Sequence, residues 1–227
     1  MIKVLHVLNN LGSGGAESFV MNVYRNIDRT KVQFDFLLRS SQNGHMVDEV
    51  RKMGGRVTIL PSFPREAMKN YIALERFLQI HAREYKAIHV HANALLYVRP
   101  LSLAKKYGIP CRIIHSHSTT SRFKVLHRMN CIRIDRWVTH RFACSKDAGL
   151  WMFPNRKFSV IPNGIDIQQF AFDDEKRREV RNLYHISNQV VLGHVGRFSP
   201  QKNHTFIIDI FEEYHDARAK SISRHDY

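Results

Sequence analysis

Apolar residues follow two alternating patterns over roughly the first 160 positions of the chain. Short and nearly continuous apolar runs are typical of parallel strands that are buried on both faces. They predict strands at 2–8, 32–38, 56–60, 87–91, 111–115, 141–145 and 158–161. Apolar residues spaced three or four positions apart predict helices between them, at 19–27, 46–53, 66–84, 95–107 and 145–152. Strands that alternate with helices predict an α/β fold with a doubly wound parallel sheet.

A Pro-Asn-Gly turn at 162–164 ends this pattern, and such a turn neither continues a strand nor starts a helix cheaply. Beyond it the pattern predicts a helix at 173–184, a strand at 190–195 and a helix at 203–214. We therefore expect a complete domain over 1–164 and the incomplete start of a second domain over 165–215. The last segment, 216–227, has only isolated apolar residues, and we expect it to be disordered.

The chain is strongly basic, with 35 Lys and Arg against 20 Asp and Glu and a net charge of +15. This surplus favours anionic partners such as nucleotide diphosphates, lipid headgroups or nucleic acid. Basic and aromatic residues do not alternate along any strand, and no recognition helix is apparent, so nucleic acid is not an expected partner. The three cysteines are far apart in apolar surroundings, which favours reduced thiols.

No apolar run approaches the ~18 residues needed to span a bilayer, and the first seven residues are too short for a signal peptide. We expect a cytoplasmic protein. The stretch 122–146 combines basic residues with interleaved apolar ones and contains a single acid, Asp135. It is a candidate for peripheral contact with the inner face of an anionic membrane. The alternative is a core helix with a solvated basic side.

A glycine-rich turn follows the first predicted strand and contains Gly14 and Gly15, with Glu17 two positions later. Backbone N–H groups of such a strand-to-helix turn can approach an anion closely, and the helix dipole adds to the attraction. The alternative is an ordinary tight turn. The glycine spacing matches neither the dinucleotide nor the Walker pattern, so the glycines alone indicate neither dinucleotide nor ATP.

Two histidine pairs end predicted strands, at 89 and 91 and at 115 and 117. Ligands of open α/β sheets bind at this carboxyl edge, and residues two apart on a strand share a face. His117 is followed by Ser118 and Thr119 in a hydroxyl-rich loop that can hold a polyol or a phosphate. No carboxylate or cysteine stands near enough in the sequence to complete a zinc site, so we expect no metal. Histidines hydrogen-bonded in loops are the remaining alternative.

Arg197 and Lys202 bracket a turn between the predicted strand at 190–195 and the following helix. Two cations in such a place offer charges for a pyrophosphate.

These motifs together resemble the bacterial retaining glycosyltransferases of the GT-B fold that assemble capsule, exopolysaccharide and lipid-linked sugars. The resemblance is carried by four segments in order, at 14–17, 117–120, 162–166 and 196–203. It implies two Rossmann-like domains, of which the first binds the acceptor and the second binds a UDP- or GDP-sugar donor. The expected acceptor is a glycan or a lipid-linked sugar, and no cofactor is expected.

The resemblance also implies roles for single residues. His117 would contact a hydroxyl of the transferred sugar, while Gly14 and Gly15 would lie against phosphate or acceptor. Arg197 and Lys202 would neutralise the departing diphosphate, which implies metal-independent transfer. Glu17, Ser118, Thr119 and Asn163 would contact the acceptor or the sugar.

The chain departs from the family pattern after residue 211, where the rest of a donor domain is expected. We expect that a frameshift or an early stop removed that domain and impaired the activity. A non-catalytic subunit that needs a separate donor-domain partner is the second reading. A nucleotide- or nucleic-acid-binding α/β protein, which only the charge suggests, is the third.

Overall fold

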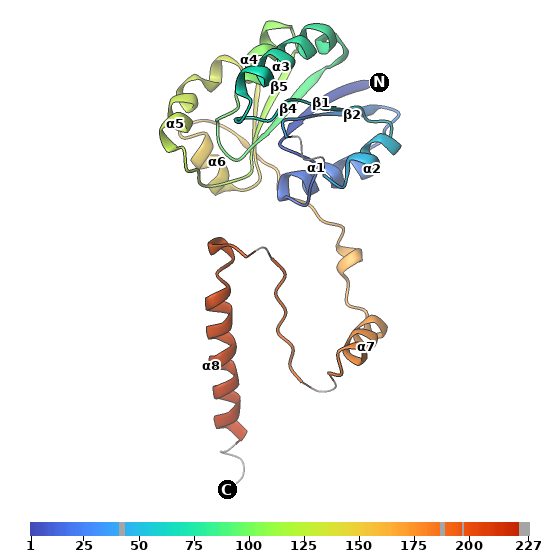
Figure 1. Cartoon of the computed structure of the whole chain (residues 1–227), viewed down its shortest axis with the longest axis vertical. Coiled ribbons are helices and arrows are strands. Elements are labelled where there is room, and N and C mark those ends of the chain that lie inside the picture. The colour runs from blue at the N-terminus through green and yellow to red at the C-terminus, as the bar shows by residue number, and fades with distance from the viewer. Residues whose placement is uncertain (41–43, 187–188, 197, 223–227) are drawn as a thin grey trace. The chain divides into compact units, whose positions relative to one another are not determined.

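The computed structural model describes residues 1–40, 44–186, 189–196 and 198–222. Within them the chain forms two compact units, Met1–Gln169 and the part that begins at Phe170. Figure 1 shows both units, and each is described here by itself.

The first unit is built on a single parallel sheet with the strand order β3-β2-β1-β4-β5-β6-β7. The strands are β1 (Ile2–Leu8), β2 (Val32–Leu38), β3 (Val57–Ile59), β4 (Ala87–Ala92), β5 (Cys111–Ser116), β6 (His140–Ala143) and β7 (Ser159–Val160). All six neighbouring pairs are parallel. The expected α/β fold with a doubly wound parallel sheet is confirmed.

Helices connect successive strands and cover the sheet (Figure 1). They are α1 (Gly15–Asn26), α2 (Val47–Lys52), α3 (Ala67–His81), α4 (Arg99–Lys106), α5 (Lys124–Arg133) and α6 (Lys146–Met152), with 3₁₀ turns η1 (Ala82–Glu84) and η2 (Ile134–Arg136). The strand order runs outward from β1 to β3, then returns to β4 and continues to β7. Because parallel crossovers are right-handed, this reversal puts α1 and α2 on one face and the later helices on the other.

Two buried clusters confirm this division between the faces of the sheet. Phe19 and Tyr24 of α1 pack with Phe36 of β2 in one cluster. Leu74 of α3 and Leu101 of α4 belong to the other cluster, as do residues of α5 and α6. The period of two along β1 sends Leu5 and Val7 into the second cluster and Leu8 into the first.

The helix expected at 95–107 begins only at Arg99. The backbone of Leu95 is used elsewhere, because its N–H donates to Nδ1 of His127 at 3.1 Å and its carbonyl accepts from Asn130 at 2.6 Å. Pro100 then fits the first turn, where its missing N–H costs nothing.

The second unit contains α7 (Asp174–Leu183), the 3₁₀ turn η4 (Pro200–Lys202) and α8 (His204–Ile222). The strand expected at 190–195 is wrong, since no ladder forms there. A strand needs a neighbour for its backbone groups, and the described part of this unit contains no other strand. Val190, Val191 and Val195 are exposed as a result.

Helix α8 extends to Ile222, whereas the sequence analysis expects disorder from residue 216. The stretch 217–220 is made of Ala, Arg and Lys, which all have high helix propensity, and such a helix needs no apolar period to form. Residues 223–227 lie outside the described part of the chain.

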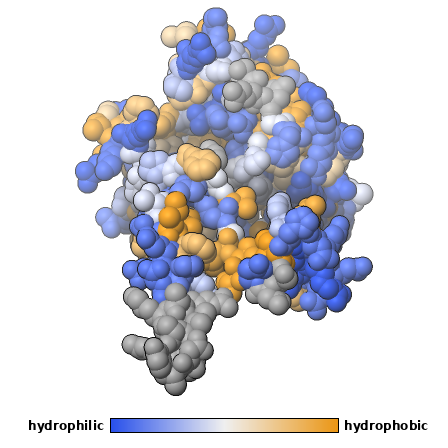
Figure 2. All heavy atoms as spheres, turned by 60° about the horizontal axis from the view of Figure 1, so that its bottom comes forward, coloured by the Kyte–Doolittle hydropathy of each residue, from blue (hydrophilic) through white to orange (hydrophobic). Residues whose placement is uncertain are grey.

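Hydrophilic side chains dominate the face drawn in Figure 2, and small apolar areas lie between them. No helix among the described residues is both long and apolar enough to cross a bilayer.

We predict that limited proteolysis cuts the chain between about Asp166 and Gln189 and leaves a resistant fragment that starts at Met1. Residues 165–172 and all but a few positions of α7 are exposed, whereas the backbone of the first unit is held in the sheet. Mass spectrometry of a short trypsin or thermolysin digest measures the cut. Equal protection of both units would contradict this expectation.

Candidate functional site

The reversal between β1 and β4 opens the carboxyl edge of the sheet, where ligands of doubly wound folds bind. Three segments meet there within the first unit. They are the turn from β1 into α1, the ends of β4 and β5, and the turn after β7.

The glycine turn presents the N-terminus of α1 without a side-chain cap. Gly14 is the N-cap residue, and it has no side chain that could accept from the first N–H groups of the helix. The carboxylate of Glu17 folds back over this residue, because a Cβ added to Gly14 would lie 2.1 Å from its Oε2. Burial raises the pKa of Glu17, and a hydrogen bond to its own backbone N–H acts in the opposite direction. A helix N-terminus favours an anion, and the carboxylate of Glu17 occupies that place here.

The turn after β7 lies directly against this helix. Nδ2 of Asn163 is 3.7 Å from the place where a Cβ on Gly15 would be, and Gly15 is exposed. Asn22 of α1 donates from Nδ2 to the carbonyl of Gly164 at 2.9 Å. The structure thus brings Asn163 next to Gly14, Gly15 and Glu17, which lie about 150 positions earlier in the sequence.

Five histidines gather on the face of the sheet next to α1. The register aligns His6 of β1 with His89 of β4, and His91 of β4 with His115 of β5. The period of two along each strand places His89 with His91, and His115 with His117, on the same face. Phe19 of α1 contacts this cluster with its ring, 5.2 Å from His115 and 6.1 Å from His117 between ring centroids. The glycine helix and the candidate catalytic histidine are therefore joined by one aromatic side chain.

Ring nitrogens of the five histidines are paired by hydrogen bonds. Nδ1 of His6 lies 3.0 Å from Nε2 of His91, and Nδ1 of His91 lies 2.9 Å from Nε2 of His117. Nε2 of His89 lies 3.2 Å from Nδ1 of His115. Three further nitrogens are buried without a partner among the described residues: Nε2 of His6, Nε2 of His115 and Nδ1 of His117.

The cluster is held in the neutral form. Burial lowers the pKa of His6 to about 3, that of His115 to about 2 and that of His117 to about 4. The pKa values of His89 and His91 lie well below the ordinary value for the same reason, and neighbouring histidines lower them further. A neutral imidazole offers one donor and one acceptor, and His117 uses its Nε2 with His91 while its Nδ1 is left without a described partner.

The hydroxyl-rich loop after His117 is ordered by its own side chains. Ser118 accepts from the N–H of Thr120 at 3.3 Å, and Ser116 donates to the carbonyl of Ala148 at 2.9 Å. Ser118 is half-buried and Thr119 is exposed. Both lie one or two positions from His117, where a bound polyol can reach them.

The two expected phosphate cations follow the first unit in the sequence. Lys202 ends η4 in the second unit and is exposed. Arg197 lies outside the described residues.

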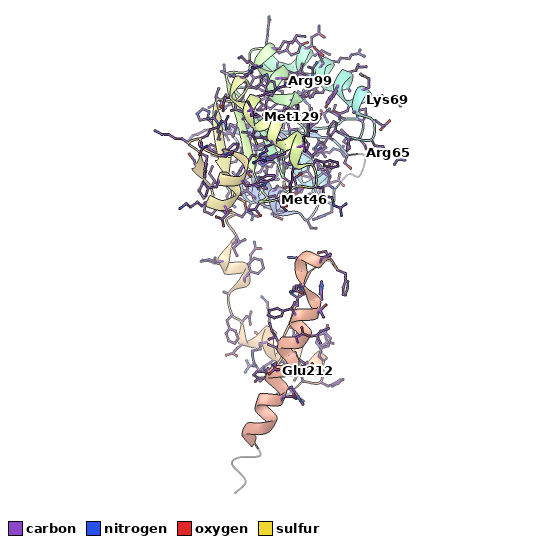
Figure 3. All side chains as sticks on the ribbon, turned by 90° about the vertical axis from the view of Figure 1, so that its left-hand side faces the viewer. Met46, Arg65, Lys69, Arg99, Met129 and Glu212 are labelled. Carbon is purple, nitrogen blue, oxygen red and sulfur yellow. The ribbon has the colours of Figure 1, made fainter. Side chains whose placement is uncertain are left out.

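The basic stretch 122–146 contains α5, which presents both charge and apolar side chains. Val125, Met129 and Ile132 of this helix are exposed, and Met129 is labelled in Figure 3. Within 122–146, the exposed basic residues that form no ion pair with a described residue are Arg122, Lys124, Arg128, Arg133, Arg136 and Lys146. Arg141 forms an ion pair with Asp135, and Arg156 forms a second ion pair with the same carboxylate.

Sequence reasoning did not identify His6 or Phe19 as parts of this site. His6 lies inside the apolar run of β1, where a single histidine is easily taken for a buried residue. The strand register could have identified His6. A strand order that reverses at β1 makes β1 and β4 neighbours, and His6 then lies opposite His89.

The chain belongs to Glycosyltransferase Family 4, whose family model matches residues 13–169. The resemblance to bacterial glycosyltransferases of the capsule and exopolysaccharide type is thereby confirmed. EpsF of Bacillus subtilis (strain 168) is 31% identical over 220 residues, which make up 92% of this chain and 57% of EpsF. The capsular polysaccharide biosynthesis glycosyltransferase CapH of Staphylococcus aureus is 24% identical, over 93% of this chain and 58% of CapH.

Solved structures confirm the fold. Anabaena Alr3699/HepE, crystallised with UDP and glucose, matches with a TM-score of 0.72 at 19% identity, over 94% of this chain and 58% of that chain. Acinetobacter baumannii MurG matches with a TM-score of 0.51 at 13% identity, over 75% of this chain and 48% of that chain. These neighbours have the GT-B fold. The chain spans a little under three fifths of the length of EpsF, CapH and HepE.

We predict that the first unit loses stability between pH 7 and pH 5. An unfolded histidine binds a proton below its ordinary pKa of about 6.5, whereas the buried cluster binds one only at lower pH. The unfolded state therefore binds more protons in this window, and the free energy of unfolding falls as pH falls. The expected loss is about 1–2 kcal/mol for each buried histidine over these two pH units.

Urea unfolding followed by circular dichroism, in buffer with EDTA, measures this pH dependence. Replacing the exposed His140 with Gln should leave the slope unchanged. A free energy of unfolding that is constant from pH 7 to pH 5 would show that the cluster is already protonated or solvated.

Proposed function

We propose that this protein acts in the transfer of a sugar from a UDP- or GDP-sugar to a glycan or lipid-linked acceptor. The observation that carries the proposal is the approach of Asn163 to Gly15 at the N-terminus of α1, with Phe19 of the same helix next to the ring of His117. An anion site and a neutral histidine next to a hydroxyl-rich loop suit phosphate and sugar in one place. Family membership supports the reaction class, and UDP with glucose in HepE supports the donor class.

In this proposal Met1 to Gly164 form the acceptor-side domain, and the residues after 164 begin the donor-side domain. His117 donates or accepts a hydrogen bond at the transferred sugar, while Gly14 and Gly15 lie against phosphate or acceptor. Glu17, Ser118, Thr119 and Asn163 complete the contacts to the acceptor or the sugar.

Lys202 and Arg197 are proposed to neutralise the departing diphosphate, so that no metal is needed at that group. Transfer then retains the configuration of the donor sugar. Removing one group that gives electrostatic stabilisation of this kind raises the activation barrier by about 3 kcal/mol, which slows the reaction about a hundredfold.

A second candidate is a non-catalytic acceptor-binding chain that works with a separate donor-domain protein. It would bind acceptor alone and transfer sugar only when the partner is added.

We predict that the chain binds at least one UDP- or GDP-sugar with a Kd in the micromolar to millimolar range. Titration with a panel of these sugars, followed by ligand-observed NMR, measures the binding. Gly15→Ala should weaken this binding about tenfold or more. The added methyl group fits beside Asn163 at 3.7 Å and favours the helix, but it occupies the space through which a phosphate reaches the N–H groups.

Ser18→Ala, an exposed change on the same helix, is the matched control and should leave binding unchanged. Binding of an acceptor analogue without any donor would support the second candidate. No binding of either ligand, or equal binding by Gly15→Ala and wild type, would contradict the proposed site.

We further propose that α5 holds the protein at the inner face of an anionic membrane, close to a lipid-linked acceptor. Its exposed Val125, Met129 and Ile132 can enter the headgroup region while the basic residues of 122–146 meet anionic lipids. A basic residue near such a surface contributes about 1 kcal/mol.

We predict that the double variant Arg128→Ala/Arg133→Ala partitions roughly 30-fold less onto phosphatidylglycerol-containing vesicles, as about 2 kcal/mol implies. Vesicle sedimentation measures the partition. Arg76→Ala/Arg83→Ala removes two exposed charges around α3 and is the control. A loss of equal size in both variants would show that only the net charge matters.

A further inference from the structure

The five clustered histidines form a set of ring nitrogens with two overlapping groups of three. In His6, His89 and His91, and again in His91, His115 and His117, one ring nitrogen of each residue lies within 4.8 Å of the other two. Three neighbouring strands hold His6, His89, His91 and His115 in register, and His117, which directly follows β5, is tied to β4 by its N–H, which donates to the carbonyl of Ala92 at 3.0 Å. A spacing of this kind suits a metal ion with nitrogen ligands.

Hydrogen bonding within the cluster leaves nitrogens unused at its ends. The residues His6, His91 and His117 form a chain in which each neutral ring can give only one proton. Whichever way the chain donates, one end retains an N–H and the other a lone pair, and both are buried without a partner among the described residues. Nε2 of His115, a fully buried residue, has no partner there either. Buried polar atoms are rarely left unpaired, and a bound cation is one of the few groups that satisfy lone pairs.

The outer group of His91, His115 and His117 is better arranged for a metal ion than the inner one. Metal-bound histidines normally donate their second ring nitrogen to a hydrogen-bond acceptor, which fixes the ring. Here His91 can donate from Nε2 to Nδ1 of His6, and His115 can donate from Nδ1 to Nε2 of His89. Nδ1 of His91, Nε2 of His115 and a nitrogen of His117 then remain for the ion.

We propose that His91, His115 and His117 bind one divalent transition-metal ion of the zinc type, and that His6 and His89 orient two of these ligands. Three imidazoles and no carboxylate among the clustered groups select zinc, cobalt, nickel or copper over magnesium and calcium, which require oxygen ligands. Three protein ligands leave a fourth position for water or for an oxygen of a bound molecule.

At the nearest pair of ligands only a small adjustment is needed to admit the ion. Tetrahedral zinc with bonds of about 2.0–2.1 Å separates its nitrogen ligands by about 3.3 Å. The nearest pair here, Nδ1 of His91 and Nε2 of His117, is 2.9 Å apart. His117 is half-buried, and its Nδ1 is not bonded to any described residue, so its ring can turn by the few tenths of an ångström required. The same residue gives the ion its route from solvent.

The proposal is tested on the untagged full chain after treatment with EDTA and removal of the chelator. Titration with Co²⁺, followed by visible absorption, reports both stoichiometry and coordination geometry, and calorimetry with Zn²⁺ gives the affinity. We expect one ion per chain, with the intense absorption of four- or five-coordinate cobalt, and a higher melting temperature in the presence of Zn²⁺.

His117→Asn should weaken Zn²⁺ binding at least about a hundredfold, because it removes a ligand from a half-buried position that tolerates change. His89→Leu should weaken Zn²⁺ binding about 10–100-fold, because Nδ1 of His115 loses the acceptor Nε2 of His89. His89→Gln supplies an amide oxygen as acceptor and should restore most of the affinity. His140→Gln removes an exposed histidine on the neighbouring strand and should have no effect. Circular dichroism verifies that each variant is folded.

X-ray absorption of the wild-type zinc complex provides a measurement that needs no variant, and it should show about three imidazole nitrogens. Weak binding at several sites, binding that His117→Asn leaves unchanged, or octahedral cobalt with mostly oxygen ligands would each overturn the proposal.

Discussion

The reversal of strand order between β1 and β4 is the constraint on which the rest of the molecule depends. It sends α1 and α2 to one face of the sheet and the later helices to the other, so no connection crosses the carboxyl edge at that point. The glycine turn follows β1 at this edge, and His117 follows β5, the neighbour of β4. The same reversal makes β1 and β4 neighbours and so brings His6 next to His89.

Buried neutral histidines destabilise a sheet unless their ring nitrogens are hydrogen-bonded, because burial of an unpaired polar group is unfavourable. Phe19 of α1 and Phe142 of β6 enclose the rings, and the ring nitrogens bond mainly to each other. The cluster therefore remains buried and neutral, and it can offer lone pairs at neutral pH. A glycosyltransferase of this family could use such a group to position sugar hydroxyls without introducing charge.

The sequence predicts much of the fold because parallel strands buried on both faces leave continuous apolar runs, and β1 and β2 have the expected bounds. It fails at 190–195, where an apolar run needs neighbouring strands that the described residues do not provide. The glycine turn and His117 are visible as motifs. The contact of Asn163 with Gly15 and the place of His6 depend on register and tertiary packing, which no local pattern encodes.

The hydrogen bond from Asn22 to the carbonyl of Gly164 ties the start of the interdomain crossover to the middle of α1. Tension on the connecting segment is therefore delivered first to α1, and not to the edge strand β7.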